Sequence, residues 1–136
     1  MWKLIAVTAL LTGGLRAADF AACPAKIDVQ RQELAKPVPG WTPALVSEPH
    51  NELWFVTIYD GEPKEMASLV PDISGRLKSG WTLARQGRTY WLECHYTETT
   101  IVLARAVPAT AKSCEVTYVP SVSLDGQPVI KQITCK

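Results

Sequence analysis

Apolar and polar residues alternate with a period of two through much of the second half of the chain, which is the pattern of half-buried β-strands. In residues 89–96, one face carries Tyr90, Leu92, Cys94 and Tyr96, and the other carries Trp91, Glu93 and His95. Further strands are predicted at residues 81–85, 100–106, 114–119 and 129–135, with a strong hairpin signal at Asp125-Gly126. Because sequential strands usually lie side by side, these segments predict one antiparallel meander.

The first half of the chain has fewer strand signals. Residues 26–30 alternate over one short strand, and residues 53–59 (LWFVTIY) predict a central strand covered on both faces. Residues 63–69 begin with a proline and predict about two helical turns. Four prolines between residues 35 and 50 predict an ordered loop, which Trp41 is expected to pin to the core. The predicted fold class is therefore mainly β with one short helix, an antiparallel meander sheet stabilised by two disulfides.

The N-terminus has the three parts of a cleavable signal peptide in residues 1–17. Lys3 supplies the positive charge, residues 4–15 form an uncharged apolar run, and Ala17 is a small residue suited to cleavage, with Ala18 as an alternative. The run is too short to span a membrane, which needs about 20 apolar residues. We therefore expect an exported chain whose residues 18–136 form a single domain without a membrane span.

Four cysteines, Cys23, Cys94, Cys114 and Cys135, all follow the predicted cleavage site. An even number of cysteines in an exported chain indicates two disulfides, and sequence alone allows three pairings. In the hairpin around Asp125-Gly126, Cys114 and Cys135 are expected at the same open end, whereas Cys94 is expected at the opposite end of the sheet. This geometry favours Cys114–Cys135 and Cys23–Cys94. Lipidation of Cys23 is disfavoured because Asp19 interrupts the apolar run before it, so the expected location is soluble and periplasmic.

Charge and motifs argue against several kinds of function. The full chain has a net charge of +1, and the leader contains Lys3 and Arg16, so the mature domain is nearly neutral and has no general attraction to nucleic acid. No nucleophile elbow, phosphate loop or set of convergent metal ligands is recognisable in the sequence. We therefore expect no catalytic residue, metal or cofactor. The carboxylates Asp60, Glu62 and Glu65 are better explained as the start of the short helix.

A candidate binding surface consists of Trp91, Glu93 and His95. If the opposite face of this strand lies in the core, Trp91 stands on the outer surface beside the two polar residues. An exposed tryptophan next to polar side chains is typical of a protein-binding hot spot. The alternative, in which the helix and loops cover both faces and Trp91 is structural, remains open.

Several motifs, taken in order, resemble a family of small exported bacterial proteins that are mostly uncharacterised. The motifs are Cys23-Pro24, Gly40-Trp41, Asp60-Gly61 with Pro63, Trp91-Leu92 with Cys94-His95-Tyr96, Cys114 with Val116, and Asp125-Gly126 with Pro128 and Cys135. The resemblance spans nearly all of the mature chain. It implies export, disulfide cysteines and a compact domain, but no reaction. Such proteins sometimes accompany secretion-system cargo loci, which favours an immunity or inhibitor role.

The leading hypothesis is an exported, non-catalytic binding protein of the bacterial envelope, with another envelope protein as its partner. An inhibitor or immunity protein against a cell-wall-acting enzyme is the form we favour, because disulfides preorganise loops for binding. One alternative is a structural or small-ligand-binding periplasmic component, which a closed apolar pocket lined by Trp54, Trp81 or Tyr96 would favour. A hydrolase that uses the cluster of Asp60 and Glu65, or the pair Glu93 and His95, is the other alternative.

Overall fold

The computed structural model describes residues 23–45 and 48–136, and its regular structure is almost entirely β. The strands are β1 (Leu53–Asp60), β2 (Ile73–Ser74), β3 (Lys78–Thr82), β4 (Tyr90–Tyr96), β5 (Val102–Ala106), β6 (Ser113–Leu124) and β7 (Gln127–Cys135). A single turn of 3-10 helix, η2 (Pro63–Glu65), follows β1. Within the described ranges, no helix is long and apolar enough to cross a membrane. The predicted signal peptide, residues 1–17, lies outside the described residues.

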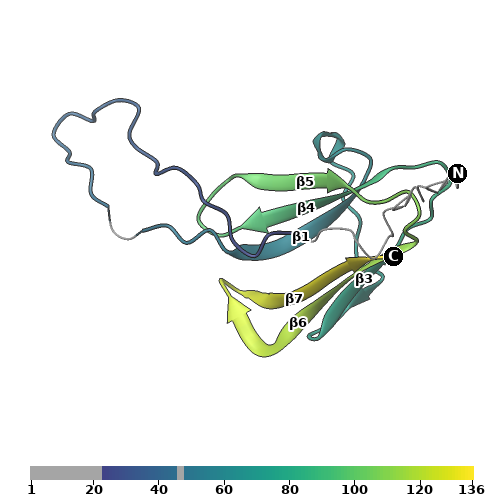
Figure 1. Ribbon diagram of the computed structural model, residues 1–136. Helices are drawn as coiled ribbons and strands as arrows, with labels where there is room; N and C mark the ends of the chain where they lie inside the picture. Colours follow the sequence, from purple (N-terminus) through teal and green to yellow (C-terminus); the bar gives the residue numbers. More distant parts are fainter. Residues whose placement is uncertain (1–22, 46–47) are drawn as a thin grey trace, which may run out of the picture.

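The strands form two antiparallel sheets that lie one above the other (Figure 1). One sheet has the order β1-β4-β5 and the other has the order β2-β3-β6-β7. Their facing surfaces bury a shared core whose largest fully buried side chains are Ile58, Leu92, Val116, Cys114 and Cys135. The predicted class, a mainly β fold of antiparallel strands with two disulfides, is confirmed.

The predicted single meander is wrong in its strand order. β3 pairs with β6, where Trp81 lies opposite Cys114, and not with β4, its neighbour in sequence. The alternation of Trp81 and Leu83 identifies the buried side of this segment, but both sheets bury their inner side against the same core. Periodicity therefore could not indicate to which sheet the strand belongs.

β1 is an edge strand of its sheet, although its composition predicted a central one. Its apolar residues are covered in other ways. The indole of Trp54 donates a hydrogen bond to the carbonyl of Leu124 in β6 at 3.1 Å, and Leu69 packs against the core from the segment after η2. These contacts cover the inner face of β1, whereas Phe55 and Tyr59 on its outer face are half-buried.

The predicted two-turn helix at residues 63–69 is reduced to the 3-10 turn η2. None of its residues is buried, and Met66 ends it with a φ of 63°. The chain then returns along β1, where the amide of Leu69 donates to the carbonyl of Ile58 at 2.8 Å. These sheet-edge hydrogen bonds use the amide of Leu69, which a helix over residues 63–69 would need for its own hydrogen bonds.

The two disulfides are Cys23–Cys94 and Cys114–Cys135, the pairs expected from the sequence. Cys114 and Cys135 are direct partners in the β6–β7 hairpin, with a Cα–Cα distance of 4.0 Å. Asp125 and Gly126, at the turn of this hairpin, both have positive φ, as a type I′ turn requires. Cys23–Cys94 joins the N-terminal segment to β4. A cysteine whose sulfur is in a disulfide cannot carry a thioether-linked lipid, which argues against lipidation of Cys23.

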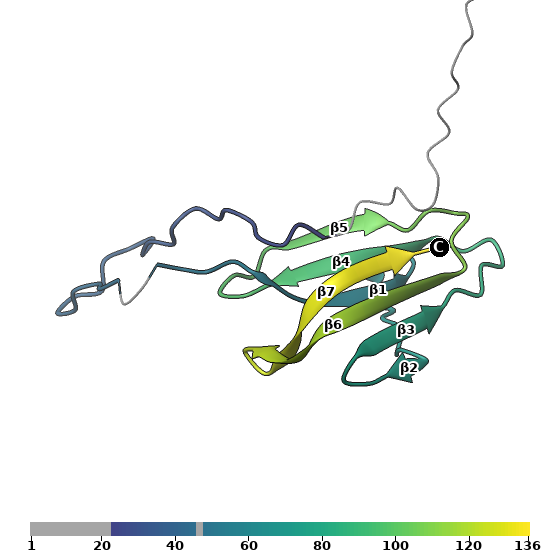
Figure 2. The same ribbon diagram turned by 60° about the horizontal axis from the view of Figure 1, so that its bottom comes forward.

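Residues 28–45 leave the two sheets and project far from them (Figures 1 and 2). We call residues 28–45 the arm; every residue from 30 to 45 is exposed. The prediction that Trp41 pins this loop to the core is wrong, because its side chain is 79% exposed. The predicted strand at residues 26–30 is reduced to one bridge between Lys26 and Glu52. The prolines restrict the backbone of the arm without supplying the ladder hydrogen bonds that would hold it against a sheet.

Removal of either disulfide should destabilise the fold. The Cys23–Cys94 bridge closes a separation of 71 residues and the Cys114–Cys135 bridge one of 21. Chain-entropy reasoning gives losses of about 4 kcal/mol for Cys23→Ser/Cys94→Ser and about 3 kcal/mol for Cys114→Ser/Cys135→Ser. Urea unfolding of the oxidised wild type and both double variants measures these losses. An unchanged free energy of unfolding in either variant would contradict this account.

Candidate functional site

The candidate site lies on the face of sheet β1-β4-β5 that points away from the core. Tyr90, Leu92, Cys94 and Tyr96 are buried on the inner side of β4, so Trp91, Glu93 and His95 project from the outer side, as predicted. The pairing with β1 places Tyr59, Thr57 and Phe55 directly opposite these three residues. We call this set the outer-face cluster: Phe55, Thr57, Tyr59, Trp91, Glu93 and His95.

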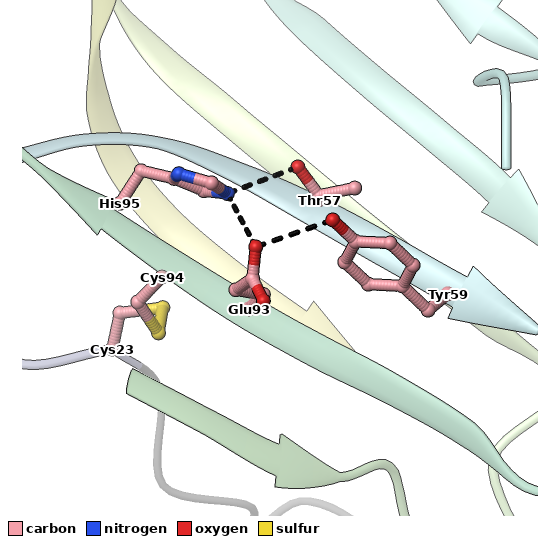
Figure 3. Close-up of polar contacts among 6 residues, drawn as sticks. All are labelled: Cys23, Thr57, Tyr59, Glu93, Cys94 and His95. Atoms are coloured by element: carbon pink, nitrogen blue, oxygen red, sulfur yellow. Dashed lines mark hydrogen bonds and ion pairs between the residues drawn. A yellow bond between two sulfur atoms is a disulfide. The ribbon is translucent and has the colours of Figure 1, made fainter. Parts of the chain in front are cut away.

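Glu93 is the centre of the hydrogen bonding in the cluster (Figure 3). Its Oε1 lies 2.9 Å from Nε2 of His95 and accepts a hydrogen bond from the Tyr59 hydroxyl at 3.2 Å. The Thr57 hydroxyl lies 3.2 Å from the same nitrogen of His95. Although Glu93 points away from the core, it is only 7% exposed. A buried carboxylate needs such partners, so the cluster holds Glu93 in one position.

Burial sets the protonation of the cluster. The pKa of His95 is lowered below its usual 6.5 because burial penalises the charged ring more than Glu93 stabilises it. His95 is therefore neutral at pH 7. Its ring stacks on Phe55, with centroids 4.1 Å apart and planes inclined by 13°. The pKa of Tyr59 is raised by burial and by the nearby Glu93, so its hydroxyl stays protonated and available as a donor.

Trp91 lies at the other end of the cluster and is half-buried. It lines an open hollow of about 470 Å³ whose other walls are mostly charged. Two ion pairs form part of this rim: Arg88 with Asp60, and Lys64 with Glu62 at 2.8 Å. An aromatic centre with a charged, solvent-accessible rim is the usual composition of a protein–protein interface.

The geometry supports catalysis or the binding of a small ligand less well than it supports the binding of a protein. The carboxylates considered for hydrolysis are partly engaged, because Asp60 and Glu62 each contact a basic side chain. The part of the chain that the structure describes contains no group of three or more side chains able to hold a metal ion. Trp81 and Tyr96 belong to the core, and the hollow shared by Trp54 and Trp81 measures about 150 Å³. This hollow is smaller than usual ligand pockets of about 300 Å³ or more. A larger hollow of about 450 Å³ that Trp81 also lines has the charged residues Asp72, Glu115 and Lys136 in its wall, so it is not the apolar pocket expected.

Half of the residues of this cluster were predictable from the sequence. Trp91, Glu93 and His95 share one face as predicted, and Glu93 and His95 are in contact. The contribution of Phe55, Thr57 and Tyr59 was missed. These residues also alternate in the sequence, but the register of β1 against β4 could not be read from it. Trp41 was assigned to the core although it stands at the surface.

Comparison with protein families gives a match. Residues 48–136 match the model of the type VI secretion system Tli immunity protein family, and they include all seven strands of the described structure and three of its cysteines. No curated protein and no solved structure matches the chain. The matched region begins beyond the arm, so it contains the whole outer-face cluster but not Trp41.

The family match decides between the functional hypotheses. Immunity proteins are non-catalytic, which confirms the prediction that the chain is not an enzyme. The partner of an immunity protein is its cognate effector, here a Tle lipase, so the predicted cell-wall-acting target is not supported. The expectation of a non-catalytic binding protein that inhibits an enzyme is confirmed. The chain belongs to the type VI secretion system Tli immunity protein family.

Proposed function

We propose that this chain protects its cell by binding its cognate Tle lipase effector in the periplasm through the outer-face cluster. The observation that supports this proposal is a row of half-buried aromatic side chains on the side of the sheet opposite to the core. Phe55, Tyr59 and Trp91 form this row on β1 and β4. A soluble protein gains nothing in its own core from apolar groups on that face, so a partner is the simplest reason for them.

The side chains of the cluster are already held in fixed positions in the free protein. Tyr59, Glu93 and His95 hold one another through hydrogen bonds, and Phe55 stacks on the histidine ring. Side chains that are already fixed lose little rotamer entropy when a complex forms. Glu93 has a positioning role in this arrangement, since its carboxylate is almost fully buried and its contacts lie within the cluster.

Trp91 is the residue from which we expect most binding energy. Tryptophan is enriched among interface residues whose truncation costs more than about 2 kcal/mol. The ion pairs around it, such as Arg88 with Asp60, form an exposed rim that excludes water from the centre. The rim charges should therefore affect association rates more than affinity.

The proposed compartment follows from the disulfides and the leader. Both cystines bridge strands or segments of the core, and such bridges form and persist in oxidising compartments. The predicted signal peptide at residues 1–17 would deliver the chain across the inner membrane. In the periplasm the protein would meet a lipase effector before that enzyme reaches the membrane lipids.

Truncation of Trp91 should weaken the complex. We expect Trp91→Ala to raise the Kd for the purified effector about 30-fold, which corresponds to a lost hot spot of about 2 kcal/mol. Val122→Ala is the control, because Val122 is 48% exposed on β6 and belongs to the other sheet. Calorimetric titration measures the Kd, and thermal unfolding shows that each variant is folded. A folded Trp91→Ala variant that binds as tightly as Val122→Ala would contradict the proposed site.

Acidification should destabilise the fold through His95. Its pKa is lowered in the folded state, so the unfolded chain binds a proton first as the pH falls. The free energy of unfolding should decrease from about pH 6.5 down to the folded pKa of His95, and this component should be absent in His95→Gln. Urea unfolding at a series of pH values measures the difference between the two proteins. An NMR titration that places the pKa of His95 above 6.5 would show that this account is wrong.

A further inference from the structure

The tip of the arm is a defined turn. In the segment Val38-Pro39-Gly40-Trp41, the amide of Trp41 donates to the carbonyl of Val38 at 3.1 Å, and Gly40 has a φ of +83°. Proline at the second position and a glycine of positive φ at the third are the pattern of a type II turn. This turn presents the Trp41 side chain, of which 79% is exposed, at the far end of the arm.

The tip is apolar and carries no charge. Residues 37–45 (PVPGWTPAL) contain no acidic or basic side chain. Besides Trp41, three large apolar residues of the arm are exposed: Leu34 by 55%, Val38 by 47% and Leu45 by 52%. Several exposed apolar side chains in one segment of a protein indicate a binding surface more than single scattered ones do. The prolines of the tip restrict φ, so less backbone entropy is lost when that molecule binds.

The base of the arm is held firmly to the sheets. Ile27 donates its amide to the carbonyl of Asn51 at 3.0 Å, and the Asn51 side chain donates to the carbonyl of Thr97 at 2.9 Å. An ion pair of 2.6 Å between Arg31 and Glu48 joins the outgoing and returning segments. The arm is therefore an extended tip on an ordered base.

The base also adjoins the outer-face cluster. The carbonyl of His50 accepts a hydrogen bond from the Thr97 hydroxyl, and the amide of His50 donates to the Glu98 carboxylate. Thr97 follows directly on the end of β4, two residues beyond His95. One partner bound at the His95 end of the cluster would thus lie next to the point where the arm leaves the protein.

The arm lies outside the part of this chain that matches the family model. The match begins at residue 48, after the end of the arm. An immunity protein must distinguish its own effector from related ones, which takes contacts that a related effector does not satisfy. The position of the arm therefore fits a contact that is particular to this chain and its effector.

We propose that the tip of the arm enters the acyl-chain cleft of the lipase effector and that Trp41 fills space which a lipid tail would occupy. The proposal rests on the function proposed above and adds the way in which binding becomes inhibition. A lipase must accept acyl chains, so its cleft is apolar and open to an uncharged, apolar segment. Desolvation of a charged or strongly hydrated tip would cost a large free energy in such a cleft, whereas the tip of this arm has no charged group to desolvate.

The test measures competition between the arm and a lipid. The Kd of the oxidised chain for its effector is determined with and without a non-hydrolysable diether phosphatidylcholine of short chain length, kept below its micelle concentration. We expect the lipid analogue to weaken wild-type binding in proportion to its concentration. Trp41→Ala should raise the Kd about 30-fold, and its remaining affinity should no longer depend on the analogue.

Two controls separate this proposal from the previous one. Val70→Ala removes an apolar side chain that is 84% exposed outside the arm, and it should behave as the wild type does. Trp41→Ala should keep the wild-type melting temperature, because the indole is mostly solvent-exposed. If the wild type binds, Trp91→Ala weakens binding and the analogue has no effect, the arm does not enter the cleft although the proposed site stands. If the wild type fails to bind the effector, both proposals are overturned.

Discussion

The arrangement of this protein depends on β4, whose two faces are both engaged. Its inner face places Leu92, Cys94 and Tyr96 in the core, and its outer face carries the cluster around Glu93. The Cys23–Cys94 disulfide fixes the incoming chain against the same strand. Because β4 pairs with both β1 and β5, it also fixes the register that brings Tyr59 to Glu93 and Phe55 to His95. A shift of β1 by one residue in that pairing would turn Phe55, Thr57 and Tyr59 toward the core and separate them from the β4 residues of the cluster.

The sequence contains enough information for the local structure but not for the assembly of the sheets. Alternation identified the inner and outer sides of β4, and Asp125-Gly126 marked the β6–β7 hairpin that brings Cys114 and Cys135 together. The pairing of β3 with β6 was not predictable, because inner residues such as Trp81 look the same in either sheet. Trp41 was misplaced for a related reason: an apolar residue is apolar both in a core and on a binding surface.

The two surfaces assigned to the effector differ in their physical character. The outer-face cluster is rigid and internally hydrogen-bonded, and it lies within the region shared by the family. The arm is extended and apolar, and it lies outside that region. This division suits an immunity protein, which needs a stable scaffold for affinity and further contacts for recognition of its own effector. The disulfide at Cys23 couples the two, since it fixes the chain just before the arm begins.

The most direct test of the central claim is oxidative footprinting of the chain, alone and in complex with its effector. Hydroxyl radicals modify exposed aromatic side chains, and mass spectrometry reports the modification of each residue. The account predicts that Tyr59, Trp91 and Trp41 lose reactivity in the complex, whereas Ile73 and Leu77, which are exposed near the edge of the other sheet, keep theirs. Protection of Ile73 and Leu77 with unchanged reactivity of Trp91 would place the effector on the opposite sheet and contradict the account.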